Sequence, residues 1–338
     1  MPAGTCYNLL KISFKIIKFG METAMSEKKK KKHTLLKVAG ATAVTGAAAY
    51  AGFGYYVFRN AFDLQHSTLY TGKNGVKRLA VGSDGKNEWF AHSTRDDDFI
   101  DSYDGLKLHA LRITNNPDSH KWIIIFHGVG SYCGGMLDQM YEADFRGFNV
   151  LAPDARGCGM SEGQYTSLGW NEHYDAISWI NFLLSVDPSA EIALYGINAG
   201  AAAVMNATGD YLPSAVKCAV EDGGFSSVKD IVLYGIRKYA KVEGKIFLPS
   251  VDLYVKNILH FSMNDVDTIR QLRQSVTPTL FIHGSEDDVV PASMVFDCYY
   301  ACAAEKDLFT AENAGFCEAQ NDPDYYKTVF DFIAKYIA

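Results

Sequence analysis

The residues that best indicate chemistry form one five-residue run, Gly196-Ile197-Asn198-Ala199-Gly200. An apolar run precedes it and a run of small helix-forming residues follows it. This is the strand–turn–helix context of the nucleophile elbow, G-x-S-x-G. The central position, which carries the nucleophile in that motif, is Asn198. A carboxamide has no hydroxyl or thiol that a neighbouring base can deprotonate, so Asn198 is not a nucleophile.

The elements that must position this turn are visible as alternating patterns along the chain. Continuous apolar runs predict buried strands of a parallel sheet at 121–126, 149–153, 192–195, 216–222 and 279–284. Helical stretches are predicted between and after them at 136–145, 170–184, 291–304 and 324–337. This alternation predicts an α/β domain, with a mostly parallel central sheet and helices on both faces.

Two further motifs follow predicted strands. His127-Gly128 ends the first strand, and the run from Asp154 to Gly163 after the second reads D-A-R-G-C-G-M-S-E-G. With these motifs, the chain from about Asp97 onward resembles the α/β-hydrolase superfamily, in its serine aminopeptidase-like and monoacylglycerol-lipase-like branch. The family has histidine where Cys158 stands. The resemblance implies an α/β-hydrolase fold with a helical cap inserted at about 226–275.

The resemblance also implies where a catalytic triad would lie. The acid position, in the stretch from His283 to Pro291, is occupied by Asp287. The base position follows Ala314-Gly315 and is occupied by Phe316, whose phenyl ring cannot accept a proton. The implied oxyanion and pocket positions are His127, Gly128, Val129, Ile197 and Ala199.

Two of three triad positions are therefore replaced, at sites more than 100 residues apart. We expect a hydrolase-fold protein that is catalytically impaired or inactive and that acts as a binding or scaffold protein. The alternative is an active hydrolase of esters or small peptides that uses a non-standard nucleophile. A third hypothesis is a purely structural partner protein.

Candidate rescuing nucleophiles have a weaker basis in the sequence. Ser161 lies in a second G-x-S-x-G run, but no strand leads directly into that run and no helix directly follows it. Cys133, Cys158 and Cys317 flank the predicted loops, yet none occupies the elbow, and free cysteine is more often a small buried apolar residue. The chain contains no metal-binding or dinucleotide motif, so we predict no metal and no cofactor.

The sequence near the N-terminus predicts a membrane-spanning segment. Five lysines at 28–32 precede 21 uncharged residues, 38–58, which is long enough to cross a bilayer. We predict a single-pass anchor in the cell membrane, with the N-terminus cytoplasmic and the hydrolase domain outside. A cleaved signal peptide, giving a secreted protein, is the alternative. Met1, Met21 and Met25 are all possible starts.

The net charge limits the classes of partner, and the length limits how the chain divides into segments. The first 37 residues carry +7, which leaves −14 for the rest of a chain of net charge −7. An acidic body without a basic stripe argues against nucleic acid as a partner. A small acyl, ester or peptide-like ligand fits the resemblance, while the oligomeric state is undetermined. The expected segments are a basic one at 1–34, anchor or signal at 35–58, linker and N-terminal strands at 59–96, and the hydrolase domain at 97–338.

Overall fold

The computed structural model describes the backbone of residues 32–67 and 84–337, with side chains from residue 45 onward. The chain divides into two compact units. The first comprises residues up to 61 together with 232–263, and the second comprises 62–231 together with 264–338. We refer to them as the helical unit and the sheet unit, and describe each by itself.

The sheet unit is built on eight strands in the order β1-β2-β4-β3-β5-β6-β7-β8. Strands β1 and β2 pair antiparallel, as do β2 and β4, and every other neighbouring pair is parallel. Their bounds are β1 Arg95–Asp101, β2 Lys107–Ile113, β3 Lys121–Phe126, β4 Asn149–Pro153, β5 Glu191–Ile197, β6 Val216–Asp222, β7 Thr279–Gly284 and β8 Lys306–Ala311. This is the mostly parallel sheet that the strand pattern predicted.

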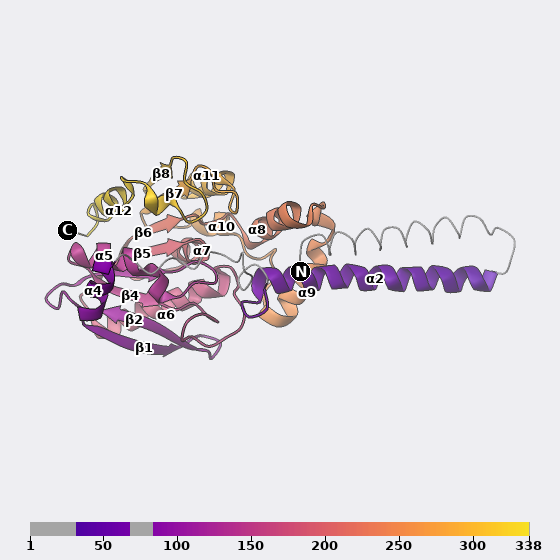
Figure 1. Cartoon of the computed structure of the whole chain (residues 1–338), viewed down its shortest axis with the longest axis horizontal. Coiled ribbons are helices and arrows are strands. Elements are labelled where there is room, and N and C mark those ends of the chain that lie inside the picture. The colour runs from indigo at the N-terminus through magenta and orange to yellow at the C-terminus, as the bar shows by residue number, and fades with distance from the viewer. Residues whose placement is uncertain (1–31, 68–83, 338) are drawn as a thin grey trace. The chain divides into compact units, whose positions relative to one another are not determined.

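Alternate side chains of the central strands pack into separate cores on the two faces of the sheet. On β3, Ile123 and Ile125 belong to one core, while Trp122 and Ile124 belong to the other. Helices α5 (Leu137–Phe145) and α12 (Tyr325–Ile333) cover the first face, and α6 (Trp170–Val186) and α7 (Ala199–Thr208) cover the second. Figure 1 shows these helices against the strands. Both faces are buried, which explains why the strands are apolar throughout.

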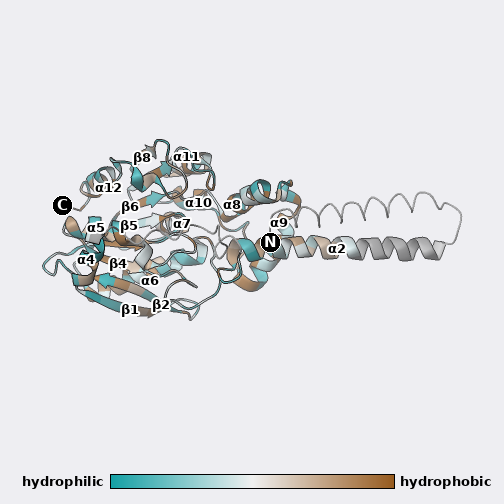
Figure 2. Cartoon of the chain, in the orientation of Figure 1, coloured by the Kyte–Doolittle hydropathy of each residue, from teal (hydrophilic) through white to brown (hydrophobic). Residues whose placement is uncertain are grey.

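The helix predictions for the sheet unit are confirmed to within a few residues. The stretches at 136–145, 170–184, 291–304 and 324–337 correspond to α5, α6, α11 (Ala292–Ala301) and α12. Helix α4 (Asp84–His92) lies inside the segment that we expected to be a linker with strands. Strand β1 is largely exposed because it is an edge strand. It is also rich in polar residues, which are teal in Figure 2.

Short helices occupy the insertion between β6 and β7, where the cap was expected. They are α8 (Val228–Gly235), α9 (Leu248–Tyr254) and α10 (Thr268–Leu272), with π-helical turns at Ile236–Ala240 and Val255–Leu259 and a 3-10 turn at Gly244–Ile246. The division into units assigns 232–263 to the helical unit and α10 to the sheet unit. We call residues 232–263 the cap segment.

Helix α2 (Lys32–Phe62) contains the whole of the uncharged stretch 38–58. Among the residues that the structure describes, no helix is long and apolar enough to cross a membrane. Of the five lysines at 28–32, only Lys32 belongs to the described residues. The membrane-spanning anchor and its orientation therefore stay predictions.

Candidate functional site

The turn between β5 and α7 has the backbone of a nucleophile elbow. Asn198 adopts φ 53° and ψ −111°, outside the regions that L-residues favour. Its N–H donates to the Asp222 carbonyl oxygen (2.8 Å), and its carbonyl oxygen accepts from Ala202 N–H (3.0 Å). A residue held in this way costs about 1–3 kcal/mol, so neighbouring contacts must hold it.

The two glycines of the motif are required by close packing. A Cβ on Gly196 would lie 2.4 Å from the Gly200 carbonyl oxygen, and one on Gly200 would lie 2.2 Å from the Phe126 carbonyl oxygen. Helix α7 therefore begins directly against the end of β3. The elbow is retained in full except for its nucleophile.

The oxyanion loop after β3 lies beside the Asn198 side chain. A Cβ built on Gly128 would be 3.3 Å from Asn198 Cβ and 3.8 Å from its Oδ1. His127 shapes this loop: its Nδ1–H donates to the Gly128 carbonyl oxygen (2.8 Å), and its Nε2 accepts from Ala155 N–H (2.9 Å). Burial lowers the pKa of His127, so the ring stays neutral and is occupied on both nitrogens.

The Asn198 amide is free to meet a molecule at the elbow. The residue is only 7% exposed, and its side chain makes no hydrogen bond to any residue that the structure describes. Its amide atoms are not among the buried unsatisfied atoms, so solvent reaches them. A carboxamide has two donors and one acceptor oxygen, which water or a ligand at the elbow would satisfy.

Asp287 lies on the loop after β7, where the acid was expected. Its Oδ1 accepts from Val289 N–H (2.7 Å) and Val290 N–H (2.9 Å), which fixes the carboxylate. Burial raises its pKa, although these two backbone donors oppose the shift. The carboxylate is held as it would be in a working triad.

The loop that carries Phe316 is joined to the Asp287 loop. Glu286 N–H donates to the Ala314 carbonyl oxygen (2.9 Å), and Asn313 N–H donates to Ser285 Oγ (2.8 Å). The structure therefore brings the base position next to the acid position, as a triad needs. Phe316 itself is half-buried and offers no proton acceptor.

Motif analysis did not identify a buried polar network beneath the elbow. Tyr325 Oη donates to Asp222 Oδ2 (2.6 Å) and is also hydrogen-bonded to Tyr195 Oη. Burial, with a contribution from the Asp287 charge, raises the pKa of Asp222 to about 7. The only signal in the sequence was that Asp222 ends the strand next to the elbow strand.

His283 is not a substitute for the missing base. Its Nε2–H donates to the Val290 carbonyl oxygen (2.9 Å) and lies 3.8 Å from Asp287 Oδ2. Burial lowers its pKa, and the residue is 1% exposed. It supports the acid loop, as its position at a strand end suggested.

The candidate rescuing nucleophiles are deactivated by their surroundings. Ser161 Oγ donates to the Asp154 carbonyl oxygen (2.7 Å) and accepts from His109 N–H (2.9 Å), so it braces a loop. Burial raises the pKa of Cys158 to about 12 and raises the pKa values of Cys133 and Cys317 above their ordinary range. These thiols are protonated at neutral pH and therefore poor nucleophiles.

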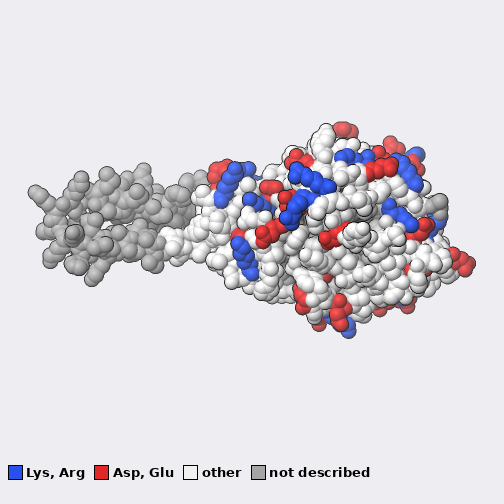
Figure 3. All heavy atoms as spheres, turned by 180° about the vertical axis from the view of Figure 1, so that it is seen from behind, with Lys and Arg blue, Asp and Glu red and all other residues white. Residues whose placement is uncertain are grey.

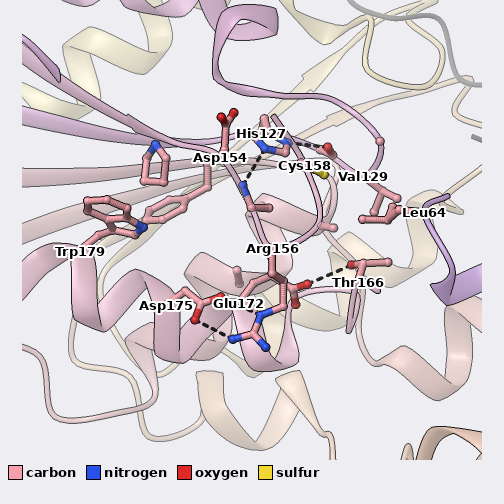
Figure 4. A pocket seen from close by; sticks show the side chains of 18 residues that line it. Leu64, His127, Val129, Asp154, Arg156, Cys158, Thr166, Glu172, Asp175 and Trp179 are labelled. Carbon is pink, nitrogen blue, oxygen red and sulfur yellow. Dashed lines mark hydrogen bonds and ion pairs between the residues drawn. The ribbon is translucent and has the colours of Figure 1, made fainter. Parts of the chain in front are cut away.

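A hollow lies beside the oxyanion loop and is lined by residues of β4, α6 and α7. Of the expected site residues, His127, Gly128, Val129 and Ala199 line it, whereas Ile197, Asn198, Asp287 and Phe316 do not. Figure 4 shows its charged wall, where Arg156 is paired with Asp175 (2.7 Å) and Glu172 accepts from Thr166 (3.0 Å). The three triad positions therefore lie outside the lining of this hollow.

One group of potential metal ligands occurs among the described residues, namely His109, Cys133 and Asp154. The Asp154 carboxylate already accepts from Cys133 N–H (2.6 Å) and Met160 N–H (2.9 Å) and faces His109 Nδ1 (2.8 Å). These bonds join β2, β4 and the loop after β3, which explains the burial of the cluster without an ion. The absence of a metal stays a prediction.

Comparison with known proteins gives the family context of this geometry. Residues 117–258 match the family model described as serine aminopeptidase, S33 (Hydrolase_4). The fold is that of the α/β hydrolases. The resemblance inferred from the motifs is thereby confirmed, and the matched residues include β3, β4, the elbow and most of the cap segment.

Two curated relatives extend over most of the same region. The uncharacterized protein YqkD of Bacillus subtilis is 27% identical over 219 residues, covering 64% of this chain and 72% of YqkD. Protein bem46 of Schizosaccharomyces pombe is 23% identical over 252 residues, covering 72% of this chain and 75% of bem46. Neither name specifies a reaction.

Solved structures resemble the fold. The esterase Pf2001 of Pyrococcus furiosus aligns with a TM-score of 0.61 at 21% identity, covering 77% of this chain and 98% of the esterase. At this level of identity the likeness concerns the fold, and function has to be argued from the site.

Proposed function

We propose that this chain is an α/β-hydrolase-fold protein that binds a ligand at its elbow and does not cleave it by triad chemistry. One observation carries the proposal. Asn198 keeps the strained backbone of a nucleophile while presenting an amide that solvent reaches and that has no partner among the described residues. Strain of this kind persists only where surrounding contacts impose it, and it is common at ligand sites.

The chemistry of the site favours a ligand with a carbonyl or carboxylate oxygen. The Asn198 amide offers N–H donors at the start of α7, a helix of ten residues whose first N–H groups and dipole also attract negative charge. Gly128 of the oxyanion loop lies against the same side chain. A small acyl, ester or peptide-like molecule would therefore bind through its oxygen at this point.

Hydrolysis of that ligand lacks both a nucleophile and a base. Phe316 replaces the histidine, and both ring nitrogens of His127 are bonded to backbone groups. His283 is bonded to the backbone only through Nε2, but its unpaired Nδ1 is buried away from solvent. Asp287 is held in place but has no imidazole to orient. The proposal therefore separates binding, which the site retains, from catalysis, which needs two restored side chains.

The test compares the full chain with Asn198→Ser and with the double variant Asn198→Ser/Phe316→His. We would measure labelling by a fluorophosphonate and hydrolysis of p-nitrophenyl butyrate. The native chain should give neither signal, and the double variant should gain labelling, because both replaced groups are restored beside a retained acid. Octanoate should raise the melting temperature of the native chain, since a ligand that binds only the folded state stabilises it.

The same experiment includes the outcome that would overturn the proposal. Labelling or turnover by the native chain that is lost in Asp287→Ala would establish an active hydrolase with a non-standard nucleophile. Ser161→Ala and Cys317→Ala would then locate that nucleophile. If octanoate and a panel of short acyl amides and peptides leave the melting temperature unchanged, the ligand-binding part of the proposal fails.

A further inference from the structure

The second half of helix α2 is built into the helical unit. Ser250 Oγ donates to the Tyr50 carbonyl oxygen (3.0 Å), and Tyr50 Oη donates to the Ile246 carbonyl oxygen (2.8 Å). The Phe53 and Phe247 rings pack with centroids 4.3 Å apart. A Cβ on Gly54 would lie 2.0 Å from Ser250 Oγ, so the helix and the cap segment touch along their backbones.

These contacts shorten the part of α2 that is available to cross a bilayer. The uncharged stretch begins at Val38, and its later part is held by the cap segment through hydrogen bonds at Tyr50 and Ala51. The 12 residues 38–49 extend about 18 Å as a helix, whereas the hydrocarbon core is about 30 Å thick. While the helical unit stays folded, α2 is too short to span the membrane.

The outward side of this unit carries aromatic and aliphatic side chains. Tyr55 is 47% exposed, Ile246 65% and Leu253 54%. All three stand at or beside contacts between α2 and the cap segment: the Ile246 carbonyl oxygen accepts from Tyr50 Oη, the Tyr55 and Tyr254 ring centroids are 5.4 Å apart, and Leu253 precedes Tyr254. Exposed apolar groups that gather in this way mark an interaction surface.

Charge indicates the chemistry of the partner. Residues 1–61 carry ten Lys and Arg against two Glu, and residues 232–263 carry five against two acids. The helical unit is therefore +11, which leaves −18 for the sheet unit in a chain of −7. In the cap segment, Lys241 and Lys245 are exposed and make no ion pair with any described residue.

A nucleic acid fits this distribution less well than a lipid surface does. Figure 3 shows Lys and Arg interspersed with Asp and Glu on the face drawn, without a continuous basic stripe. Tyrosine, isoleucine and leucine beside scattered lysines are instead typical of a surface that sits at the boundary of headgroups and acyl chains.

We propose that the helical unit binds the surface of membranes that contain anionic lipids. Lys241 and Lys245 are attracted to the headgroups, and Tyr55, Tyr56, Ile246 and Leu253 enter the interface. In this proposal the protein is held at the membrane by the surface of its helical unit and not by a single-pass anchor. The proposal does not depend on the proposed ligand site.

The test is co-sedimentation of the full chain with phosphatidylcholine vesicles that contain either no phosphatidylserine or 30 mol% of it, a composition chosen for the assay. Binding should require phosphatidylserine and should fall as salt rises, because headgroup attraction is screened within a Debye length. Lys241→Glu/Lys245→Glu should weaken binding roughly tenfold or more. The matched control is Lys327→Glu/Lys335→Glu, the same charge change on α12 and the turn that follows it in the sheet unit, which should bind like the native chain.

A second pair of measurements addresses insertion. Tyr55→Ser/Leu253→Ser should reduce binding at high salt, where only apolar contacts remain. Alkaline carbonate should release the native protein from membranes, as it does a surface-bound protein. Resistance to carbonate would establish a spanning anchor and overturn the proposal. Equal binding to neutral and anionic vesicles, or salt-sensitive binding to a DNA duplex without vesicle binding, would also overturn it.

Discussion

At the scale of single residues, this chain differs from a working serine hydrolase mainly at two side chains. The backbone of Asn198 and the backbone donors to Asp287 are those that a triad requires. The loop of Phe316 is hydrogen-bonded to the acid loop. Replacement of these two side chains leaves the surrounding backbone in place, and for this reason we propose ligand binding without triad catalysis.

Asp222 gives a residue-scale prediction about pH. Its pKa is about 7 in the folded protein against 3.8 for the free group, because burial and the Asp287 charge raise it by more than the Tyr325 hydrogen bond lowers it. Between about pH 4 and pH 7 the folded state holds a proton that the unfolded state has released, so this group makes the free energy of unfolding fall as pH rises. Asp222→Asn should flatten that part of the profile, measured by urea unfolding from pH 4 to 8.

The Asp222→Asn variant keeps an oxygen to accept the Tyr325 hydrogen bond, so the network should survive. The control is Asp118→Asn, which changes an exposed carboxyl in the sheet unit. An unchanged slope in Asp222→Asn, or an equal change in both variants, would show that Asp222 is ionised like an exposed acid.

At the scale of elements, the packing of α7 against β3 depends on one glycine. Gly200→Ala places a Cβ 2.2 Å from the Phe126 carbonyl oxygen, and neither backbone can move without shifting the elbow. We expect a loss of about 3 kcal/mol in the free energy of unfolding. Gly85→Ala in α4 is the control, since nothing lies within 4 Å of its Cβ position, and helix propensity should make it neutral or stabilising. Equal stabilities of the two variants would refute this account of the motif.

The elements that the sequence predicted well are those with the strongest apolar pattern. Strands β3, β4 and β5 are buried on both faces, so a continuous apolar run identified them. Strand β1 reads R-D-D-D-F-I-D and is mostly exposed, and β8 is a half-exposed edge strand. Their positions follow from pairing with β2 and β7, which no local pattern encodes.

The same distinction holds for the candidate site. Asn198, Asp287 and Phe316 were found because they stand at fixed offsets in motifs. The bond between Tyr325 and Asp222 joins residues 103 apart in sequence, and Tyr195 lies 130 residues from Tyr325. Nothing near any of these tyrosines predicts such a contact. The hollow beside the oxyanion loop was likewise unpredictable, because it is defined by side-chain packing.

At the scale of the whole molecule, the chain divides into units of opposite charge. The sheet unit is acidic and carries the elbow. The helical unit is basic and is made of two segments that lie far apart in sequence. This separation of charge is the basis on which we propose that the helical unit is the one that meets an anionic surface.

The joining of these two segments can be tested with neighbouring glycines of α2. Gly54→Ala places a Cβ 2.0 Å from Ser250 Oγ and 2.8 Å from the Ser250 carbonyl carbon, so the helix should separate from α9. Hydrogen exchange of the α9 amides should then be faster than in the native chain. Gly52→Ala meets nothing within 4 Å and should leave the exchange unchanged or slower. Identical exchange in the two variants would mean that the segments do not support each other.

The contact between α2 and the cap segment also has a consequence for synthesis on the ribosome. The bond from Ser250 to Tyr50 joins residues 200 apart. At about 5–20 residues per second, the aromatic side of α2 therefore emerges roughly 10–40 s before its partner exists. During that interval Phe53 and Phe58, both buried in the finished protein, have no cap segment to cover them. A chaperone or a lipid surface that covers this helix first would decide whether the cap segment assembles on it in water or at a membrane.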